Sequence, residues 1–221
     1  MWQIVPTVTA SSRIRHRSRR LAMLRVPCTT FPRTAPHALR FMHLFHHVLA
    51  SPIGNIAITT DAADVAHAVT LQERDADLPK LLTRLYGVHT LQRAASPGLA
   101  VQALARYFEG ERAALAEIAV AQPGNALQRQ VWSALRNIPV GTVTHYGALA
   151  KRLSITDRGA AWKIGQANAA NPIAIVVPCH RVIGKNGMLT GFAWGIDRKR
   201  WLLLHEGADL SDGASLLLPG F

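Results

Sequence analysis

The chain has 221 residues, 49% of them hydrophobic, which is enough to form the core of one large domain or two small ones. It holds no apolar run of about 18 residues, so we do not expect it to cross a membrane. With only two cysteines, Cys28 and Cys179, a disulfide framework is not expected, and a reducing compartment, the cytoplasm, is the predicted location.

The formal net charge of +12 is unevenly distributed along the chain. Residues 1–41 contain eight arginines and no acidic residue, residues 42–120 have a small excess of acidic side chains, and residues 121–221 carry eleven basic and five acidic side chains. A basic carboxyl-terminal part is typical of proteins that bind polyanions such as DNA. An arginine-rich proteome would explain the same charge, so the charge alone does not decide the function.

Residues 1–41 are predicted to be disordered. Ser, Thr, Pro and Arg dominate residues 7–37, and no apolar periodicity continues long enough to bury a core. An acid-free, arginine-rich leader is compatible with a transit peptide, but no long apolar segment follows Arg20, as a secretory signal would require. We favour a mis-assigned extension, with translation starting at Met42.

Residues 42–120 predict a small α/β scaffold domain built on an antiparallel sheet. Alternating apolar residues bounded by turn residues predict three strands, over residues 44–49, 55–60 and 65–72. Apolar residues at helical spacing, followed by a glycine, predict helices over residues 78–86 and 99–108. Three clustered histidines have no cysteine or acidic residue nearby, so we interpret them as strand residues and not as metal ligands: His43, His46 and His47.

Residues 121–221 predict a second, mainly helical domain, which makes the fold α/β of the α+β kind. Asn125 with Gln128 has the pattern of a capping box, and the helix that it opens ends before Pro139. Two further helices, over residues 145–153 and 160–169, predict a helix-turn-helix, with Thr144 as the N-cap of the first. The second is rich in Ala, Gly and Asn and poor in acid, so its backbone can lie close to DNA.

The segment 175–182, with the sequence IVVPCHRV, offers a nucleophile. Its β-branched residues predict a buried strand that Pro178 ends, which leaves Cys179 at the carboxyl edge. His180 and Arg181 place potential positive charge beside the thiol, and such charge lowers the pKa of a cysteine. A free cysteine is also commonly a small buried apolar residue, so this motif alone leaves both interpretations open.

Four segments resemble, in order and spacing, the methylated-DNA-protein-cysteine methyltransferases, or O(6)-alkylguanine-DNA alkyltransferases. They are Ile138–Ala150, Ala167–Pro172, Pro178–Val182 and Trp201–Gly207. The resemblance covers residues 125–207, is loose over residues 43–110 and does not extend to residues 1–41. It implies DNA repair by direct reversal, in which an alkyl group moves irreversibly from O(6)-methylguanine in double-stranded DNA to Cys179. O(4)-methylthymine is a further candidate substrate.

The resemblance also implies roles for side chains around the acceptor. His180 is expected to deprotonate Cys179 through a water, and Glu206 to hold the imidazole in the right tautomer. Asn171 is expected to brace the turn at the active site, and Tyr146 to donate a proton or a hydrogen bond to the departing base. A buried Tyr or Glu can also be a packing residue, and that interpretation stays open for both.

The family flips its target nucleotide out of the duplex, and an arginine near the start of the recognition helix fills the vacated place. Trp162 stands at that position here. Its indole could wedge between bases while Lys163 supplies the lost charge, or it could turn into the core and weaken flipping. The residues that we expect to contact DNA are Ala160, Trp162, Lys163, Gln166 and Arg181.

The loop 188–196, which in the family covers the flipped base, also departs from the family pattern. Ala193 stands where a small hydroxyl residue or an arginine is often found, so it offers only its backbone amide. Trp194 is expected to narrow the pocket and Phe192 to form its apolar wall. The predicted base pocket consists of Val177, Pro178, Phe192, Ala193 and Trp194.

No phosphate-binding loop, dinucleotide fingerprint or metal-ligand spacing is found, so neither a cofactor nor a metal is expected. A thioether on Cys179 has no evident route back to the thiol, so we expect each molecule to act once, as a monomer without an obligatory protein partner. Three alternatives stay open: a relative that binds alkyl lesions without repair, a methylation-responsive DNA-binding regulator, and a cysteine hydrolase.

Overall fold

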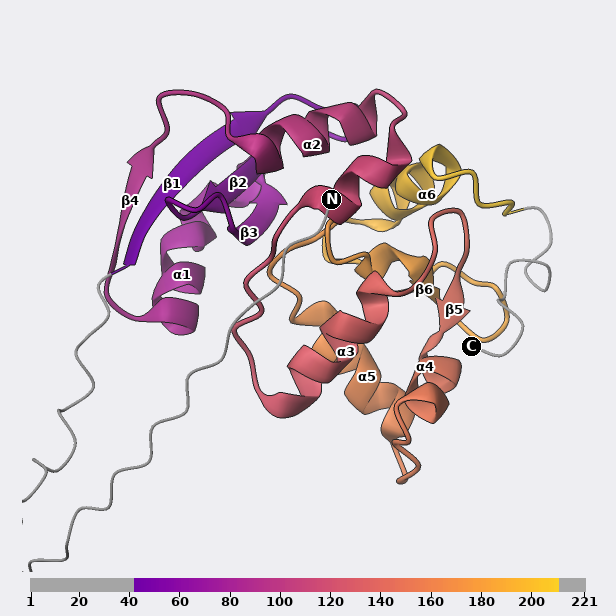
Figure 1. The fold of residues 1–221 in the computed structure, drawn as a ribbon. Helices are drawn as coiled ribbons and strands as arrows, with labels where there is room; N and C mark the ends of the chain where they lie inside the picture. The colour runs from indigo at the N-terminus through magenta and orange to yellow at the C-terminus, as the bar shows by residue number, and fades with distance from the viewer. Residues whose placement is uncertain (1–41, 211–221) are drawn as a thin grey trace, which may run out of the picture. The chain divides into compact units, whose positions relative to one another are not determined.

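The structure is a computed structural model that describes residues 42–210. The predicted leader, residues 1–41, lies outside the described residues, as do residues 211–221. None of the helices between residues 42 and 210 has the length and apolar composition needed to span a membrane. In chain order the elements are β1 (Met42–Leu49), β2 (Ile56–Thr60), β3 (Ala66–Leu71), η1 (Gln72–Asp77), α1 (Leu78–Tyr86), β4 (His89–Arg93), α2 (Leu99–Phe108), η2 (Arg112–Glu117), α3 (Ala126–Arg136), β5 (Thr144–His145), α4 (Tyr146–Arg152), α5 (Ala160–Ala169), η3 (Cys179–Arg181), β6 (Val182–Ile183) and α6 (Ile196–His205), where η marks a short 3-10 helix (Figure 1).

The sheet of the first part is mixed, which corrects the predicted antiparallel sheet. Its strand order is β3-β2-β1-β4, and the three predicted strands pair antiparallel. The fourth strand, β4, pairs parallel with β1, in a register that sets Leu44 opposite Leu91. The sequence missed β4 because the five residues HTLQR carry a single large apolar side chain. β1 holds the three clustered histidines, and residues 42–210 contain no group of ligands that could hold a metal ion.

Helices cover both faces of this sheet (Figure 1). Leu78 and Leu82 of α1 pack on one face, in a cluster with Leu44 of β1. Leu104 of α2 belongs to the cluster on the other face, together with Ile58 of β2. Both helices have the bounds predicted from the sequence, because apolar spacing and a following glycine are local signals.

The helical part begins with α3, whose predicted capping box is present. The Asn125 side chain accepts a hydrogen bond from Gln128 N, and the Gln128 side chain accepts one from Asn125 N, each at 2.9 Å. Trp132 of α3 is buried and donates from Nε1 to Ala167 O of α5 at 2.8 Å, which fixes α5 to the core. The N-cap of α4 is His145, not the predicted Thr144, because the His145 side chain accepts from Ala148 N.

A two-stranded parallel ribbon brings distant parts of this region together. Thr144 of β5 pairs with Val182 of β6. Tyr146 follows β5 directly, and the helix η3 that starts at Cys179 precedes β6 directly. The ribbon therefore sets the start of α4 beside the cysteine.

Candidate active site

The segment before the cysteine is a buried turn, which corrects the predicted strand. Residues 173–177 make only single backbone bridges, and Ile175 has a φ of 71°, a left-handed value that a β-branched residue rarely adopts. The Asn171 side chain closes the turn, because Nδ2 donates to Val177 O at 2.8 Å and Oδ1 accepts from Ile173 N at 3.0 Å. This geometry fits the bracing role expected for Asn171.

Cys179 begins η3 and is 6% exposed. Burial raises the pKa of its thiol, and hydrogen bonding from Asn171 and the positive charge of Lys199 oppose that rise without cancelling it. The expected net lowering of this pKa is therefore wrong, because burial outweighs the groups that lower it, a backbone hydrogen bond from His180 among them. The resting thiol is protonated at neutral pH, so nucleophilic attack requires a base.

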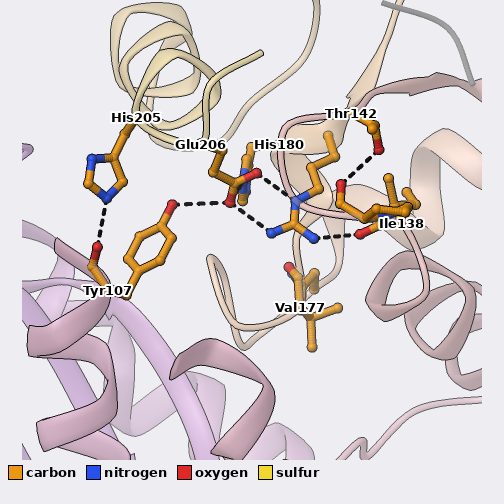
Figure 2. Close-up of polar contacts among 10 residues, drawn as sticks. Tyr107, Ile138, Thr142, Val177, His180, His205 and Glu206 are labelled. Atoms are coloured by element: carbon orange, nitrogen blue, oxygen red, sulfur yellow. Dashed lines mark hydrogen bonds and ion pairs between the residues drawn. The ribbon is translucent and has the colours of Figure 1, made fainter. Parts of the chain in front are cut away.

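His180, the residue after Cys179 in the chain, forms a buried pair with Glu206. His180 Nε2 lies 3.0 Å from Glu206 Oε1, and both side chains are 0% exposed (Figure 2). Burial lowers the pKa of His180, although Glu206 opposes this shift, so the imidazole is neutral. An ionised carboxylate only accepts hydrogen bonds, so Nε2 carries the proton. His180 Nδ1 has no hydrogen-bond partner among residues 42–210, and it is the atom left to accept a proton.

Arg181 is buried, which corrects the prediction that it contacts DNA. Its Nε donates to Glu206 Oε2 at 2.7 Å and its Nη2 to Glu206 Oε1 at 2.8 Å, while Nη1 donates to Ile138 O at 2.6 Å. Burial alone would raise the pKa of Glu206, but His180 and Arg181 outweigh burial and lower it. Arg181 is thus an internal counter-ion that keeps Glu206 charged.

Glu206 follows α6 and is approached from two sides. Gly141, at a φ of 77°, lies so close that a Cβ there would be 2.9 Å from the Glu206 carbonyl oxygen, so this turn requires glycine. On the other side, the hydroxyl of Tyr107 in α2 donates to Glu206 Oε1 at 3.1 Å (Figure 2). Sequence reasoning missed Tyr107 because the contact joins positions 99 residues apart and no local pattern marks it.

Lys199 is another residue that the sequence did not single out. Its side chain is fully buried in α6, and Nζ donates to Val182 O at 2.6 Å and to Thr190 O at 2.7 Å. Burial lowers its pKa to about 8, and the negative charge of an ionised Cys179 opposes this shift. Lys199 therefore ties β6 and the loop after it to α6, and it places a cation near the sulfur.

Tyr146, at the start of α4, is half-buried. Burial raises the pKa of its phenol, and so does the negative charge of Cys179 once its thiol has ionised, whereas a hydrogen bond with Thr190 lowers it. A Cβ at Gly191 would lie 3.7 Å from the Tyr146 hydroxyl oxygen. The hydroxyl thus faces both the cysteine and the loop that is predicted to cover the flipped base.

This loop carries three of the predicted pocket residues. Phe192 is half-buried, with its ring centre 6.5 Å from that of His180 and 5.8 Å from that of Trp194. Trp194 is 7% exposed, whereas Ala193 is exposed and accepts a hydrogen bond at its carbonyl from Arg74. The other two predicted pocket residues, Val177 and Pro178, are buried in the turn before the cysteine.

Helix α5 consists mostly of residues with small side chains and exposes one large aromatic residue, Trp162. Trp162 is 68% exposed, so the alternative that it belongs to the core is wrong. Gln166, one turn later, is also exposed, while Ile164 and Ala167 point into the core. Lys163 forms an ion pair with Asp157 in the preceding turn. Ala160 is half-buried against the core.

Comparison with known proteins places the chain among DNA repair proteins. The family description "6-O-methylguanine DNA methyltransferase, DNA binding domain" matches residues 126–208, and "6-O-methylguanine DNA methyltransferase, ribonuclease-like domain" matches residues 44–122. A methylated-DNA–protein-cysteine methyltransferase of Salmonella typhimurium is 44% identical over 75% of this chain and 97% of that protein. One of Methanosarcina mazei is 37% identical over 76% of this chain and 99% of that protein.

The solved structure of Mycobacterium tuberculosis OGT in complex with DNA matches with a TM-score of 0.59 and 34% identity, over 74% of this chain and 92% of that chain. The matched family descriptions and these relatives define a class of DNA-binding methyltransferases. The chain belongs to the 6-O-methylguanine DNA methyltransferase family. The α+β fold class predicted from the sequence is confirmed.

Proposed function

We propose that Cys179 is the acceptor for the alkyl group of O(6)-methylguanine in double-stranded DNA. The chain is a DNA repair enzyme that transfers an alkyl group from DNA to a cysteine, and Cys179 is the one cysteine within residues 42–210. The observation that carries the proposal is the buried His180–Glu206 pair beside it. A thiol whose pKa burial raises requires a base, and this pair supplies one.

The reaction is a displacement at the alkyl carbon. His180 Nδ1 takes the thiol proton, through a water as the family resemblance implies, and Glu206 stabilises the imidazolium that forms. The thiolate sulfur attacks the methyl carbon, the carbon–sulfur bond forms as the carbon–oxygen bond breaks, and the electron pair of the broken bond leaves with guanine. Tyr146 donates a proton or a hydrogen bond to the departing base. Asn171 and Lys199, which oppose the rise in the thiol pKa, stabilise the thiolate.

The DNA contact is proposed for the exposed face of α5. Trp162 fills the place that the flipped nucleotide leaves, as apolar wedges do at other kinked or unstacked steps, and Gln166 lies one turn further along the same face. Ala160 leaves room for the backbone of DNA. The ammonium group of Lys163 is paired with the Asp157 carboxylate, so it can bind a DNA phosphate only when this exposed ion pair opens.

The flipped base is proposed to enter the space under the loop 188–196. Phe192 supplies an apolar wall near the His180 ring, and Trp194 narrows the pocket from its buried position. Ala193 offers its backbone amide. Val177 and Pro178 form the floor next to the acceptor.

The proposed enzyme acts once per molecule. His180, Glu206 and Tyr146 move protons, and proton transfer does not cleave a thioether, so the methylated Cys179 is a final product. One flipped base needs one site, and we propose a monomer with a scaffold domain over residues 42–120 and an alkyltransferase domain over residues 121–221. The acceptor must stay a free thiol, and we place the protein in a reducing compartment, the cytoplasm.

Titration with a duplex that contains one O(6)-methylguanine is expected to remove lesions until one has been lost per protein molecule, and then to stop. The remaining lesion is measured by chromatography of the digested DNA, with the unmodified duplex as a control for binding. Continued loss beyond one equivalent would identify a turnover enzyme such as a hydrolase. Binding without any loss would identify a lesion-binding protein.

A further inference from the structure

Tyr107 connects the sheet-bearing part of the chain to the catalytic carboxylate. Its side chain is 0% exposed, and its hydroxyl donates to Glu206 Oε1 at 3.1 Å. The main-chain oxygen of the same residue accepts from His205 Nε2 at 2.7 Å, and the rings of Tyr107 and His205 meet edge to face at 4.9 Å. Tyr107 is therefore held at both ends by consecutive residues at the end of α6 (Figure 2).

The hydroxyl shares its acceptor atom with the catalytic base. Glu206 Oε1 accepts from three donors, which are His180 Nε2 at 3.0 Å, Arg181 Nη2 at 2.8 Å and the Tyr107 hydroxyl at 3.1 Å. Each donor draws electron density from that oxygen, so each weakens the pull of the carboxylate on the other two. The hydrogen bond from α2 thereby limits how strongly Glu206 favours the protonated form of His180.

We infer that Tyr107 is a positioning residue of the transfer reaction, which sets the basicity of His180 by sharing the Glu206 oxygen to which the imidazole is bound. This inference rests on the proposed role of His180 as the base for Cys179. It gives the scaffold domain a part in the chemistry: α2 supplies a donor that the helical part does not provide for itself.

Other charged groups also face this cluster. Glu206, Arg181 and Lys199 act on His180, and Arg112 and Arg181 face Tyr107. Cys179 lies next to His180 in the chain, and His205 contacts the Tyr107 ring. Lys199 and Cys179 titrate on the alkaline side. The fall of the methyl-transfer rate at acidic pH, called the acidic limb of the pH–rate profile below, therefore reports protonation of His180.

Replacement Tyr107→Phe removes one donor and leaves the ring. Glu206 then binds the imidazolium more strongly, so the acidic limb of the single-turnover methyl-transfer rate is expected to move to higher pH. The expected shift is about half a unit to one unit, the size of one hydrogen bond, with a rate about 3- to 10-fold lower on that limb. Affinity for the duplex is expected to be unchanged.

The matched control is Tyr86→Phe. The Tyr86 hydroxyl also makes one hydrogen bond inside the same part of the chain, to His67 O at 3.3 Å, but it has no contact with Glu206. This variant is expected to keep the limb of the parent protein. An equal loss of rate at every pH in Tyr107→Phe, with the limb unmoved, would show that Tyr107 only packs, and would overturn the inference.

A second variant covers the case in which Tyr107→Phe does not fold. Tyr107→3-fluorotyrosine keeps the ring and the hydroxyl and is a stronger donor, so the acidic limb is expected to move to lower pH. No movement in this variant would overturn the inference as well. Absence of methyl transfer by the parent protein would instead refute the proposed function, so the two failures are distinguishable.

Discussion

Replacement of Glu206 with glutamine is expected to lower the rate of methyl transfer by about 10²- to 10⁴-fold, the range that a positioned general base contributes. Both oxygens of Glu206 accept hydrogen bonds, whereas a glutamine has only one side-chain oxygen. In the variant, either His180 or Arg181 therefore loses a hydrogen-bond acceptor. An arginine left buried without its counter-ion costs about 3 to 5 kcal/mol of the free energy of unfolding. Glu206→Gln is thus expected to affect both stability and chemistry.

The loss of stability is expected to depend on pH with a definite sign. The pKa of Glu206 is lower in the folded protein than its ordinary value of 4.5, so the ionised carboxylate stabilises the fold above about pH 4.5 and this contribution is lost as the pH falls below that value. Glutamine has no such contribution. Parent and variant are therefore expected to differ most near pH 7 and less in acid, as denaturant unfolding at pH 7 and pH 4 would measure.

The matched control for Glu206 is Glu117→Gln. Glu117 also pairs with an arginine, Arg106, but its side chain is 57% exposed. Exposed pairs contribute about 0 to 1 kcal/mol, so this variant is expected to unfold and to transfer methyl groups like the parent. Equal behaviour of Glu206→Gln and Glu117→Gln would contradict the assignment of Glu206 to the site.

Replacement of Trp162 with alanine is expected to slow repair of O(6)-methylguanine in duplex DNA by about 5- to 150-fold, since stacking of one base on an aromatic side chain is worth about 1 to 3 kcal/mol. The side chain is 68% exposed, so stability is expected to stay within about 0.5 kcal/mol of the parent. A free alkylated guanine base needs no flipping, and its rate of reaction with Cys179 is expected to be unchanged.

Two further variants test whether Trp162 acts as the wedge. Trp162→Arg restores the family's residue and is expected to retain repair of the duplex. Gln166→Ala removes an exposed side chain from the same helix face and is expected to have a smaller effect. Equal losses on duplex and free base in Trp162→Ala would place this residue in the pocket or the core and would exclude the wedge.

The features that the sequence predicted well are those with local causes. The bounds of α1 and α2 follow from apolar spacing and a glycine stop, and the start of α3 follows from the side chains of Asn125 and Gln128. The strand β4 could not be predicted from the sequence, because it forms by parallel pairing with β1, more than forty residues earlier in the chain. Such long-range pairing leaves no local sequence pattern.

The candidate site shows the same division. Motifs in the sequence indicate Cys179, His180 and Glu206, whereas the composition of the buried turn before the cysteine is typical of a strand and predicts one. The Asn171 side chain stabilises the turn, because it forms hydrogen bonds with Ile173 at the start of the turn and with Val177 at its end. The predicted DNA contact of Arg181 is wrong because charged residues are usually exposed, and the sequence does not show that Glu206 is its buried partner.

The most direct test of the account is the intact mass of the protein after reaction with a duplex containing one O(6)-methylguanine, measured beside a Cys179→Ser control. The parent is expected to gain about 14 Da, one methyl group in place of a proton, and the control is expected to gain nothing. An unchanged mass of the parent, or an equal gain in Cys179→Ser, would contradict the central claim that Cys179 accepts the alkyl group.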